Sequence, residues 1–234
     1  MATRVKICGL TNLEDAEAAV GMGAWALGMI FAEGSPRRCA PEQAQRIAAA
    51  LKRRVELCGV FVNEPLDDVA AAARDIGLTM LQFHGEEGPS YCREAARRTG
   101  ARVIRAQQVA GPGDVREIER YHVDFHLLDA RSQRHPGLRG GTGETFDWEL
   151  LRGRRSKVPL ILGGGIDAGN AAGAIAAVRP YAIDTASGTE SAPGHKDYER
   201  MAALFAAVRE ADGDPNEVAS AAAPSVAGTL RGAP

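Results

Sequence analysis

The sequence predicts a single (β/α)₈ (TIM) barrel, a fold of the α/β class, and three observations lead to this prediction. The chain has 234 residues, close to the roughly 250 that are typical of such a barrel. Short apolar runs rich in β-branched residues alternate with alanine-rich helical stretches, as expected for βα units around a parallel sheet. The pattern repeats eight times, which favours a closed barrel over an open, doubly wound sheet.

Each element can be located along the chain. The predicted strands are 4–8, 25–31, 55–62, 79–83, 102–106, 124–128, 158–162 and 181–185. The predicted helices are 12–21, 41–51, 65–75, 87–98, 113–120, 147–152, 168–177 and 196–210. Asn12 and Asp167 precede helical stretches that their side chains can cap. Pro41 and Pro65 lie where a first helical turn accepts proline.

The elements end near residue 210, so the catalytic domain is expected to cover 1–210. Residues 211–234 consist mainly of Ala, Gly, Pro and Ser without apolar periodicity. A segment of this kind cannot bury enough apolar surface to fold. We therefore expect a disordered C-terminal tail and no second domain.

Composition narrows the classes of partner and compartment. The net charge is −2, whereas nucleic-acid binders usually carry a basic face. No uninterrupted apolar run is long enough for a membrane span, and the first residues do not form a signal-peptide pattern. The four cysteines include no Cys-x-x-Cys pair, which disfavours a zinc knuckle or a redox pair. These features predict a cytoplasmic protein with free thiols and with neither nucleic acid nor membrane as partner.

Polar residues gather where the predicted strands end. Catalytic groups of α/β barrels lie at the C-terminal ends of the strands and in the loops that follow. The strand ends contribute Cys8, Ser35 to Arg37, Asn63, Gln82 to Gly85, Gln107, Asp129, Gly163 to Gly165 and Asp184 to Gly188. A ring of such residues indicates an active site.

Two glycine-rich turns predict a phosphate site. Gly164 and Gly165 lead from the seventh strand toward a helix, and Ser187 and Gly188 follow the eighth strand. Consecutive backbone N–H groups at such a turn can converge on an anion, and a helix start adds positive potential. The alternative is that each glycine only permits a tight turn. Two such turns in succession favour phosphate.

Cys8 and Asp129 are the candidates for proton transfer. Cys8 ends the first strand, and Lys6, two residues earlier, points to the same side. A nearby ammonium is expected to lower the thiol pKa from its ordinary value of roughly 8.5. Asp129 ends an apolar run, where partial burial would raise its pKa and let it hold a proton at neutral pH. The structural alternatives are a core thiol and a carboxylate that caps the following loop.

Arg37 and His84 complete the candidate site. Arg37 can clamp an anionic group through paired hydrogen bonds, or it can simply be solvated. His84 can act as a ligand or a base, or form a hydrogen-bonded wall of the site. The residues alone do not decide between these roles.

The motifs Lys6 to Thr11 (KICGLT), Gly59 to Asn63 (GVFVN) and Leu81 to Glu87 (LQFHGEE) resemble those of the phosphoribosylanthranilate isomerase family of tryptophan biosynthesis. The similarity continues through Leu127 to Asp129, Gly140 to Trp148 and Asp184 to Glu190, in family order over about 1–210. Ala186 departs from the serine more frequent there and cannot supply a hydroxyl.

The resemblance implies an Amadori rearrangement of N-(5-phosphoribosyl)anthranilate to 1-(2-carboxyphenylamino)-1-deoxyribulose 5-phosphate. It implies that Asp129 protonates the ring oxygen and that Cys8 removes the C2 proton. Arg37, His84 and Asp184 would bind the substrate, with Arg37 at the anthranilate end. No metal or cofactor is required, and the family includes monomers and homodimers.

The nearest alternative is the histidine-pathway barrel isomerase, which performs the same rearrangement on a substrate with two phosphates. That family resembles this one but has aspartate where Cys8 stands. Acting on both substrates would require a second phosphate cradle, for which Gly111 to Gly113 is a faint candidate. A phosphosugar-binding regulator without activity is a further alternative, which the presence of both Cys8 and Asp129 disfavours.

Overall fold

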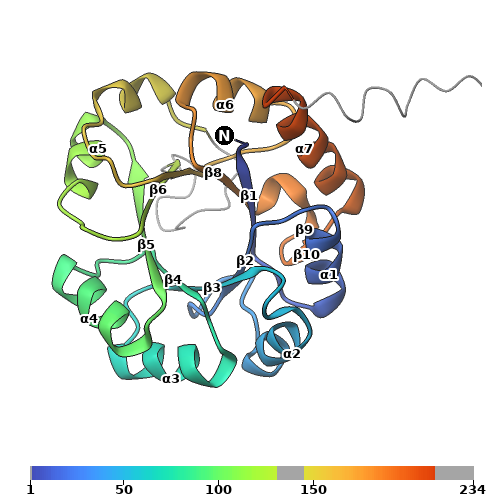
Figure 1. Ribbon diagram of the computed structural model, residues 1–234, viewed down its shortest axis with the longest axis vertical. Helices are drawn as coiled ribbons and strands as arrows, with labels where there is room; N and C mark the ends of the chain where they lie inside the picture. The colour runs from blue at the N-terminus through green and yellow to red at the C-terminus, as the bar shows by residue number, and fades with distance from the viewer. Residues whose placement is uncertain (1, 131–144, 214–234) are drawn as a thin grey trace, which may run out of the picture.

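A computed structural model describes residues 2–130 and 145–213. Eight parallel strands form a closed barrel in chain order, with β1 paired to β8 (Figure 1). The strands are β1 (Arg4–Cys8), β2 (Ala26–Ile30), β3 (Glu56–Phe61), β4 (Met80–Phe83), β5 (Arg102–Val109), β6 (Phe125–Ala130), β7 (Leu160–Leu162) and β8 (Ala182–Thr185). The predicted (β/α)₈ barrel is confirmed.

The helices form a ring outside the strands (Figure 1). They are α1 (Leu13–Gly21), α2 (Pro41–Leu51), α3 (Leu66–Ile76), α4 (Pro89–Thr99), α5 (Pro112–Ile118), α6 (Ala171–Val178) and α7 (Tyr198–Ala211). Two 3₁₀ helices, η1 (Trp148–Gly153) and η2 (Ser187–Thr189), and an antiparallel hairpin of β9 (Glu190–Ala192) and β10 (His195–Lys196) complete the described elements.

Two of the four expected helix-start signals act as predicted. The Asn12 side chain accepts a hydrogen bond from the Asp15 amide at 2.8 Å and caps α1. Pro41 is the first residue of α2, where its missing N–H costs nothing. Pro65 stands one position earlier than expected, as the N-cap of α3.

The sixth and seventh helices differ from the prediction. Residues 147–152 were expected to form an α-helix, but the segment is the 3₁₀ helix η1, tightened by Asp147, which accepts the Glu149 amide at 2.9 Å. Asp167 was expected to cap the next helix. Its carboxylate instead accepts the amides of Gly169 and Asn170, which forms a separate turn, and α6 begins at Ala171.

The C-terminal boundaries also differ. The hairpin β9–β10 was not predicted, and α7 starts after it, with Asp197 accepting the amides of Glu199 and Arg200. The helix continues to Ala211, and Asp212 accepts a hydrogen bond from the Thr3 hydroxyl at 2.9 Å. The first residues of the predicted tail, 211–213, are therefore part of the described structure, although all three are exposed. The rest of the predicted tail, 214–234, lies outside the described residues.

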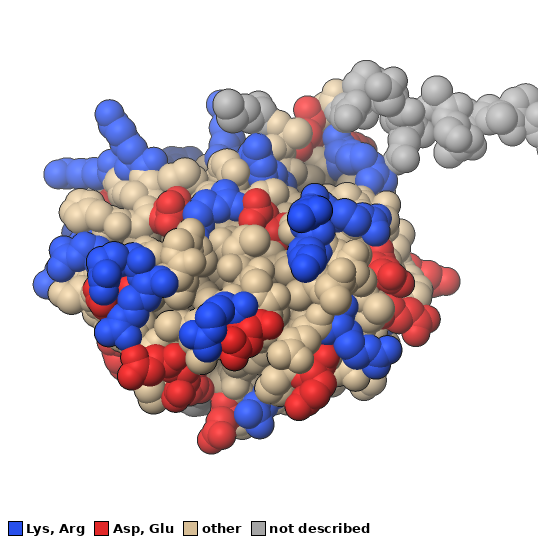
Figure 2. Space-filling view, turned by 60° about the horizontal axis from the view of Figure 1, so that its bottom comes forward, with Lys and Arg blue, Asp and Glu red and all other residues tan. Residues whose placement is uncertain are grey.

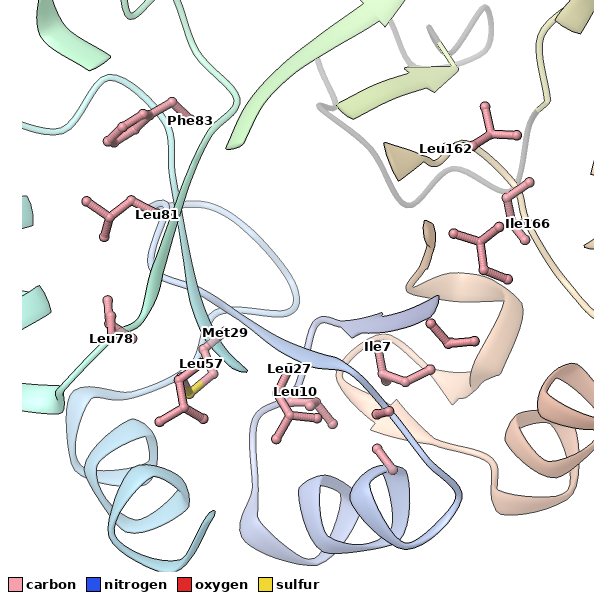
Figure 3. Close-up of a cluster of buried hydrophobic side chains, with 14 of the residues drawn as sticks. Ile7, Leu10, Leu27, Met29, Leu57, Leu78, Leu81, Phe83, Leu162 and Ile166 are labelled. Carbon is pink, nitrogen blue, oxygen red and sulfur yellow. The ribbon is translucent and has the colours of Figure 1, made fainter. Parts of the chain in front are cut away.

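The buried apolar residues form two layers. Outward-facing strand residues such as Ile7, Leu27 and Leu81 pack against the helices (Figure 3). Inward-facing residues such as Met80, Ile104 and Leu127 fill the barrel interior. Alternation along each strand separates the two layers. It also turns the last inward residues of the strands toward the C-terminal mouth, where the site lies.

On the face that Figure 2 presents, basic and acidic side chains are interspersed. Within residues 2–130 and 145–213, no helix is long and apolar enough to cross a membrane.

Candidate active site

A cavity of about 450 Å³ opens at the C-terminal ends of the strands, and five of the predicted site residues line it. They are Cys8, Arg37, His84, Asp129 and Asp184. Gln82 and Ala186 line it as well, together with apolar residues that include Val60. The barrel therefore brings these five residues, far apart in the sequence, to one place.

Cys8 is the last residue of β1 and is 5% exposed. Lys6 points into the barrel on the same side, as the alternation predicted, and its ammonium pairs with the Asp184 carboxylate at 2.7 Å. Gly28 of β2 makes room for both groups, because a Cβ there would lie 2.7 Å from the Cys8 sulfur and 3.0 Å from the Lys6 nitrogen. A side chain at position 28 would displace the thiol.

The expected lowering of the Cys8 pKa is wrong. Burial raises the pKa of the Cys8 thiol above its ordinary value, and this outweighs the opposing effect of Lys6. Asp184 weakens that effect further, because its negative charge also disfavours the thiolate. The prediction included the ammonium but not the burial of the thiol or the carboxylate that pairs with that ammonium.

Asp129 has the properties of a proton donor. The carboxyl group is 6% exposed and lies within β6, because this strand extends two residues beyond its predicted end. Burial, with a further contribution from the Asp184 carboxylate, raises the pKa of Asp129 to about 7. Its Oδ2 lies 3.7 Å from Nε2 of His84. A substantial fraction of Asp129 is therefore protonated near neutral pH.

The loop that carries His84 rests on a buried ion pair. Glu87 and Arg105 approach to 3.2 Å, and both are nearly inaccessible to solvent. Glu87 accepts the amides of Asn63 and Gly85 at 2.6 and 2.7 Å, and Arg105 donates to the Gly85 carbonyl at 2.9 Å. These bonds fix the loops after β3 and β4, and with them the wall of the cavity at His84.

Gln82 also faces this wall and is 2% exposed. Among the residues that the structure describes, its side-chain oxygen has no hydrogen-bond partner although it is buried. Buried polar atoms nearly always have a partner. The sequence singled out Gln82 only by its position after the fourth strand.

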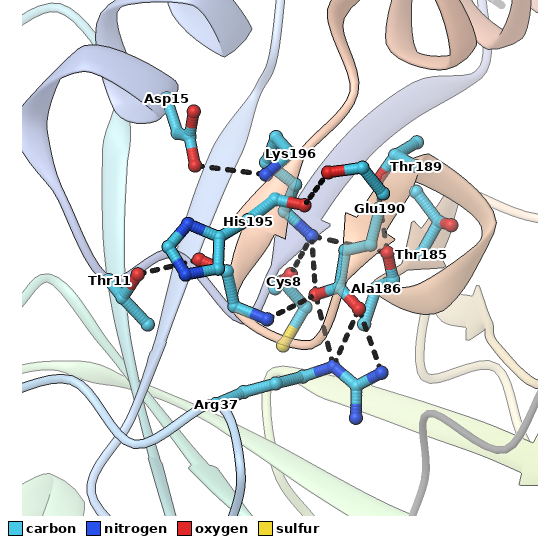
Figure 4. A network of polar contacts seen from close by, with 12 residues as sticks. Cys8, Thr11, Asp15, Arg37, Thr185, Ala186, Thr189, Glu190, His195 and Lys196 are labelled. Atoms are coloured by element: carbon cyan, nitrogen blue, oxygen red, sulfur yellow. Dashed lines mark hydrogen bonds and ion pairs between the residues drawn. The ribbon is translucent and has the colours of Figure 1, made fainter.

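Arg37 lies at the edge of the cavity in a paired contact that the sequence did not reveal. Its guanidinium Nε and Nη2 contact the Glu190 carboxylate at 2.9 and 2.8 Å (Figure 4). Lys196 lies on the other side of the same carboxylate, at 3.1 Å. Glu190 belonged to a recognised motif, but no role was assigned to it, and Lys196 was not singled out.

The two glycine turns lie side by side in a second cavity of about 460 Å³, which Gly165, Ser187 and Gly188 line together with Arg200. Gly164 and Gly165 have φ angles of +86° and +61°, in the left-handed region that favours glycine. Gly188 packs against the Ile166 carbonyl so closely that a side chain would clash there. The predicted pairing of the turns after β7 and β8 is thus present.

The described residues offer no group of three or more His, Cys, Asp or Glu side chains arranged to hold a metal ion.

A closed barrel with a buried carboxylic acid and a thiol in one strand-end cavity defines an enzyme of the (β/α)₈ class that can move protons. A family model for N-(5'-phosphoribosyl)anthranilate isomerase matches residues 5–207. The isomerase of Geobacter sp. (strain M21) is 45% identical over 208 residues, which is 89% of this chain and 98% of the relative.

Solved structures agree with this match. The phosphoribosylanthranilate isomerase of Thermus thermophilus is 40% identical, with a TM-score of 0.78, and covers 89% of this chain and 99% of its own. A phosphoribosylanthranilate isomerase in complex with reduced 1-(o-carboxyphenylamino)-1-deoxyribulose 5-phosphate is 36% identical, with a TM-score of 0.76, over 90% and 99% of the two chains. The chain belongs to the phosphoribosylanthranilate isomerase family.

Proposed function

We propose that this isomerase rearranges N-(5-phosphoribosyl)anthranilate with Asp129 as general acid and Cys8 as general base. The supporting observation is that both groups line one cavity and that the pKa of Asp129 lies near 7. A carboxyl group with this pKa can donate a proton near neutral pH. The structure of a relative with a reduced form of the product supports the choice of substrate.

The rearrangement is proposed to proceed through ring opening, removal of the C2 proton and return of a proton to C1. The Asp129 carboxyl protonates the ring oxygen, the bond from C1 to that oxygen breaks, and the nitrogen lone pair forms an iminium with C1. The Cys8 thiolate then removes the C2 proton, and the released electron pair forms the C1–C2 double bond of an enolamine. Finally the Cys8 thiol returns a proton to C1 while Asp129 accepts the proton of the C2 hydroxyl. The product is the ketone, and both groups regain their starting states.

Arg37, His84 and Asp184 are proposed to bind the substrate from the cavity wall. Arg37 itself lines the opening and supplies a guanidinium for the anthranilate carboxylate. The Lys6 ammonium holds the Asp184 carboxylate in place at 2.7 Å. His84 faces Asp129 and can orient its carboxyl group.

The pH dependence of turnover tests the proposed acid and base, with loss of anthranilate fluorescence as the assay. The reactive form has a protonated Asp129 and a Cys8 thiolate, so the two groups together hold one proton. The apparent pKa values of such a coupled pair belong to the pair rather than to one residue. The pair holds one proton between a pKa of about 7 and the raised pKa of the thiol. We expect kcat/KM to be constant in that range and to fall about tenfold per pH unit below 7. Activity that increases steadily below pH 7 would contradict the assignment.

The phosphate is proposed to bind at Gly164, Gly165, Ser187 and Gly188. The supporting observation is that Gly165, Ser187 and Gly188 line one cavity next to the catalytic one. Inorganic phosphate soaked into crystals is expected between these two turns, because backbone amides at such turns can converge on an anion. Phosphate found only at Arg37, with the glycine turns empty, would refute this location.

A second substrate with two phosphates is not supported. Gly111 to Gly113 was the candidate for another cradle, but Asp114 already accepts the amides of Ala110 and Gly111 at 2.7 and 3.0 Å. A carboxylate at these donors repels a phosphate.

We propose that the enzyme acts as a monomer or homodimer in the cytoplasm, where its four free thiols would stay reduced.

A further inference from the structure

Lys196 is a buried lysine whose ammonium connects three parts of the site. It donates to the carbonyl of Cys8 at 2.7 Å, to the carbonyl of Ala186 at 3.1 Å and to the Glu190 carboxylate at 3.1 Å (Figure 4). An ammonium has three hydrogens, so all of them have an acceptor. The side chain of Lys196 is 0% exposed. The bonds join the end of β1 to the loop after β8.

The hairpin β9–β10 is itself anchored on both sides. The Lys196 amide donates to Asp15 at the start of α1 at 3.0 Å, and Asn12 holds the same carboxylate at 2.9 Å. Glu190 contacts Arg37 with both carboxylate oxygens. The segment from Glu190 to Lys196 therefore connects the thiol strand, the phosphate-side loop and the arginine after β2.

We propose that Lys196 and Glu190 are positioning residues for the isomerase reaction: Lys196 fixes the main chain that carries Cys8 and provides its positive charge nearby, while Glu190 fixes the guanidinium of Arg37. This inference rests on the proposed role of Cys8 as base. Both residues are buried, and no sequence motif indicated a role for either of them.

The charges around Cys8 explain why a lysine is needed here. Four ionisable groups act on the thiol or its immediate surroundings: Lys6 of β1, Cys58 of β3, Asp184 of β8 and Lys196 of β10. Lys6 is paired with Asp184, so these two charges nearly cancel. Glu190 is shared between Lys196 and Arg37. These three residues together therefore carry one net positive charge. Lys196 thus lowers the pKa of Cys8 and partly offsets its burial.

Alkylation of Cys8 by iodoacetamide in the substrate-free protein tests the role of Lys196. The rate would be followed against pH by mass spectrometry of the Cys8 peptide. In Lys196→Met the midpoint is expected to increase by about one pH unit, because a neighbouring cation favours the thiolate. Alkylation near neutral pH and kcat should then each fall about tenfold, since the thiolate is the reactive form.

Two further variants separate charge from packing. Lys196→Gln keeps side-chain donors for the carbonyls of Cys8 and Ala186 but lacks the charge. It should therefore shift the alkylation midpoint as Lys196→Met does. If Lys196→Met does not fold, Lys196→Gln serves as the test. Glu56→Gln is the matched control, because it removes a half-buried ion pair with Arg102 at the opposite end of the barrel. It should leave both alkylation and turnover unchanged.

Glu190→Gln should behave differently from the lysine variants. Arg37 loses the carboxylate that fixes it, so KM is expected to rise several-fold, while the alkylation midpoint of Cys8 does not rise. Unchanged alkylation and kcat in a folded Lys196→Gln protein would overturn the proposal for Lys196. An unchanged KM in Glu190→Gln would overturn that for Glu190. Because alkylation does not depend on turnover, these outcomes are distinct from a failure of Cys8 to act as base.

Discussion

Replacing Cys8 by serine is expected to reduce turnover by several orders of magnitude while substrate binding is retained. Serine keeps the shape of the residue, but its hydroxyl has a far higher pKa and cannot supply a base. Loss of general acid–base help typically costs roughly 10²–10⁴-fold. The effect here should reach or exceed this range, because the serine hydroxyl keeps its proton at the pH values at which the enzyme works.

Turnover and binding must be measured separately, since the phosphate turns and Arg37 lie apart from the thiol. Cys92→Ser is the matched control: this thiol is also buried, at 1% exposure, but lies on α4 and does not line the cavity. It should retain nearly full turnover. If Cys8→Ser keeps more than about a tenth of the turnover, Cys8 is not the base, and His84 becomes the leading candidate.

Asp129→Asn is expected to be similarly damaging, at the ring-opening step. The amide keeps the shape and the contact with His84 but has no acidic proton, so a fall of roughly 10²–10⁴-fold in kcat is expected. Asp124→Asn is the matched control, because Asp124 stands just before the same strand, at the opposite end of the barrel, and accepts the Val103 amide at 2.8 Å. Near-normal turnover in Asp129→Asn would exclude Asp129 as the acid.

The stability of the same variant shows whether lost activity reflects unfolding. The folded pKa of Asp129, about 7, lies above the ordinary value. Its stabilising contribution is therefore present below the unfolded pKa of about 3.9 and is lost as the pH rises through 7. Above pH 7 the wild type must keep an unfavourable buried carboxylate. Asp129→Asn should then unfold at no lower a temperature than the wild type at pH 8, as thermal denaturation can check.

The positions of the candidate residues were predictable because strand ends are easy to recognise. Apolar runs that stop at Cys8, Asp129 and Asp184 mark the mouth of a barrel, and the structure places all three in one cavity. The ionisation of Cys8 was not predictable in the same way. It depends on burial by other strands, including the space left by Gly28, and no pattern near Cys8 indicates that packing.

Glu190 and Lys196 were beyond the reach of local patterns for a different reason. The hairpin that carries them is short and directly precedes α7, so the predicted helix 196–210 absorbed part of it. Their partners are distant in sequence: Arg37 is separated from Glu190 by 153 positions and Cys8 from Lys196 by 188. Periodicity describes neighbours along the chain, whereas these contacts arise only from barrel closure.

The closure of β1 onto β8 also has a consequence for the order of events during synthesis. Lys6 and Cys8 precede their partners Asp184 and Lys196 by nearly the whole length of the barrel and are therefore synthesised before them. Until then the Lys6 ammonium lacks the carboxylate with which it forms an ion pair at 2.7 Å, and enclosing an unpaired charge is costly. A barrel that closed around seven strands would enclose the unpaired ammonium of Lys6 at a cost in free energy. This cost favours a barrel that stays open until β8 is available. We therefore expect the barrel to close late, and the thiol has its complete set of partners only once β8 and β10 are in place.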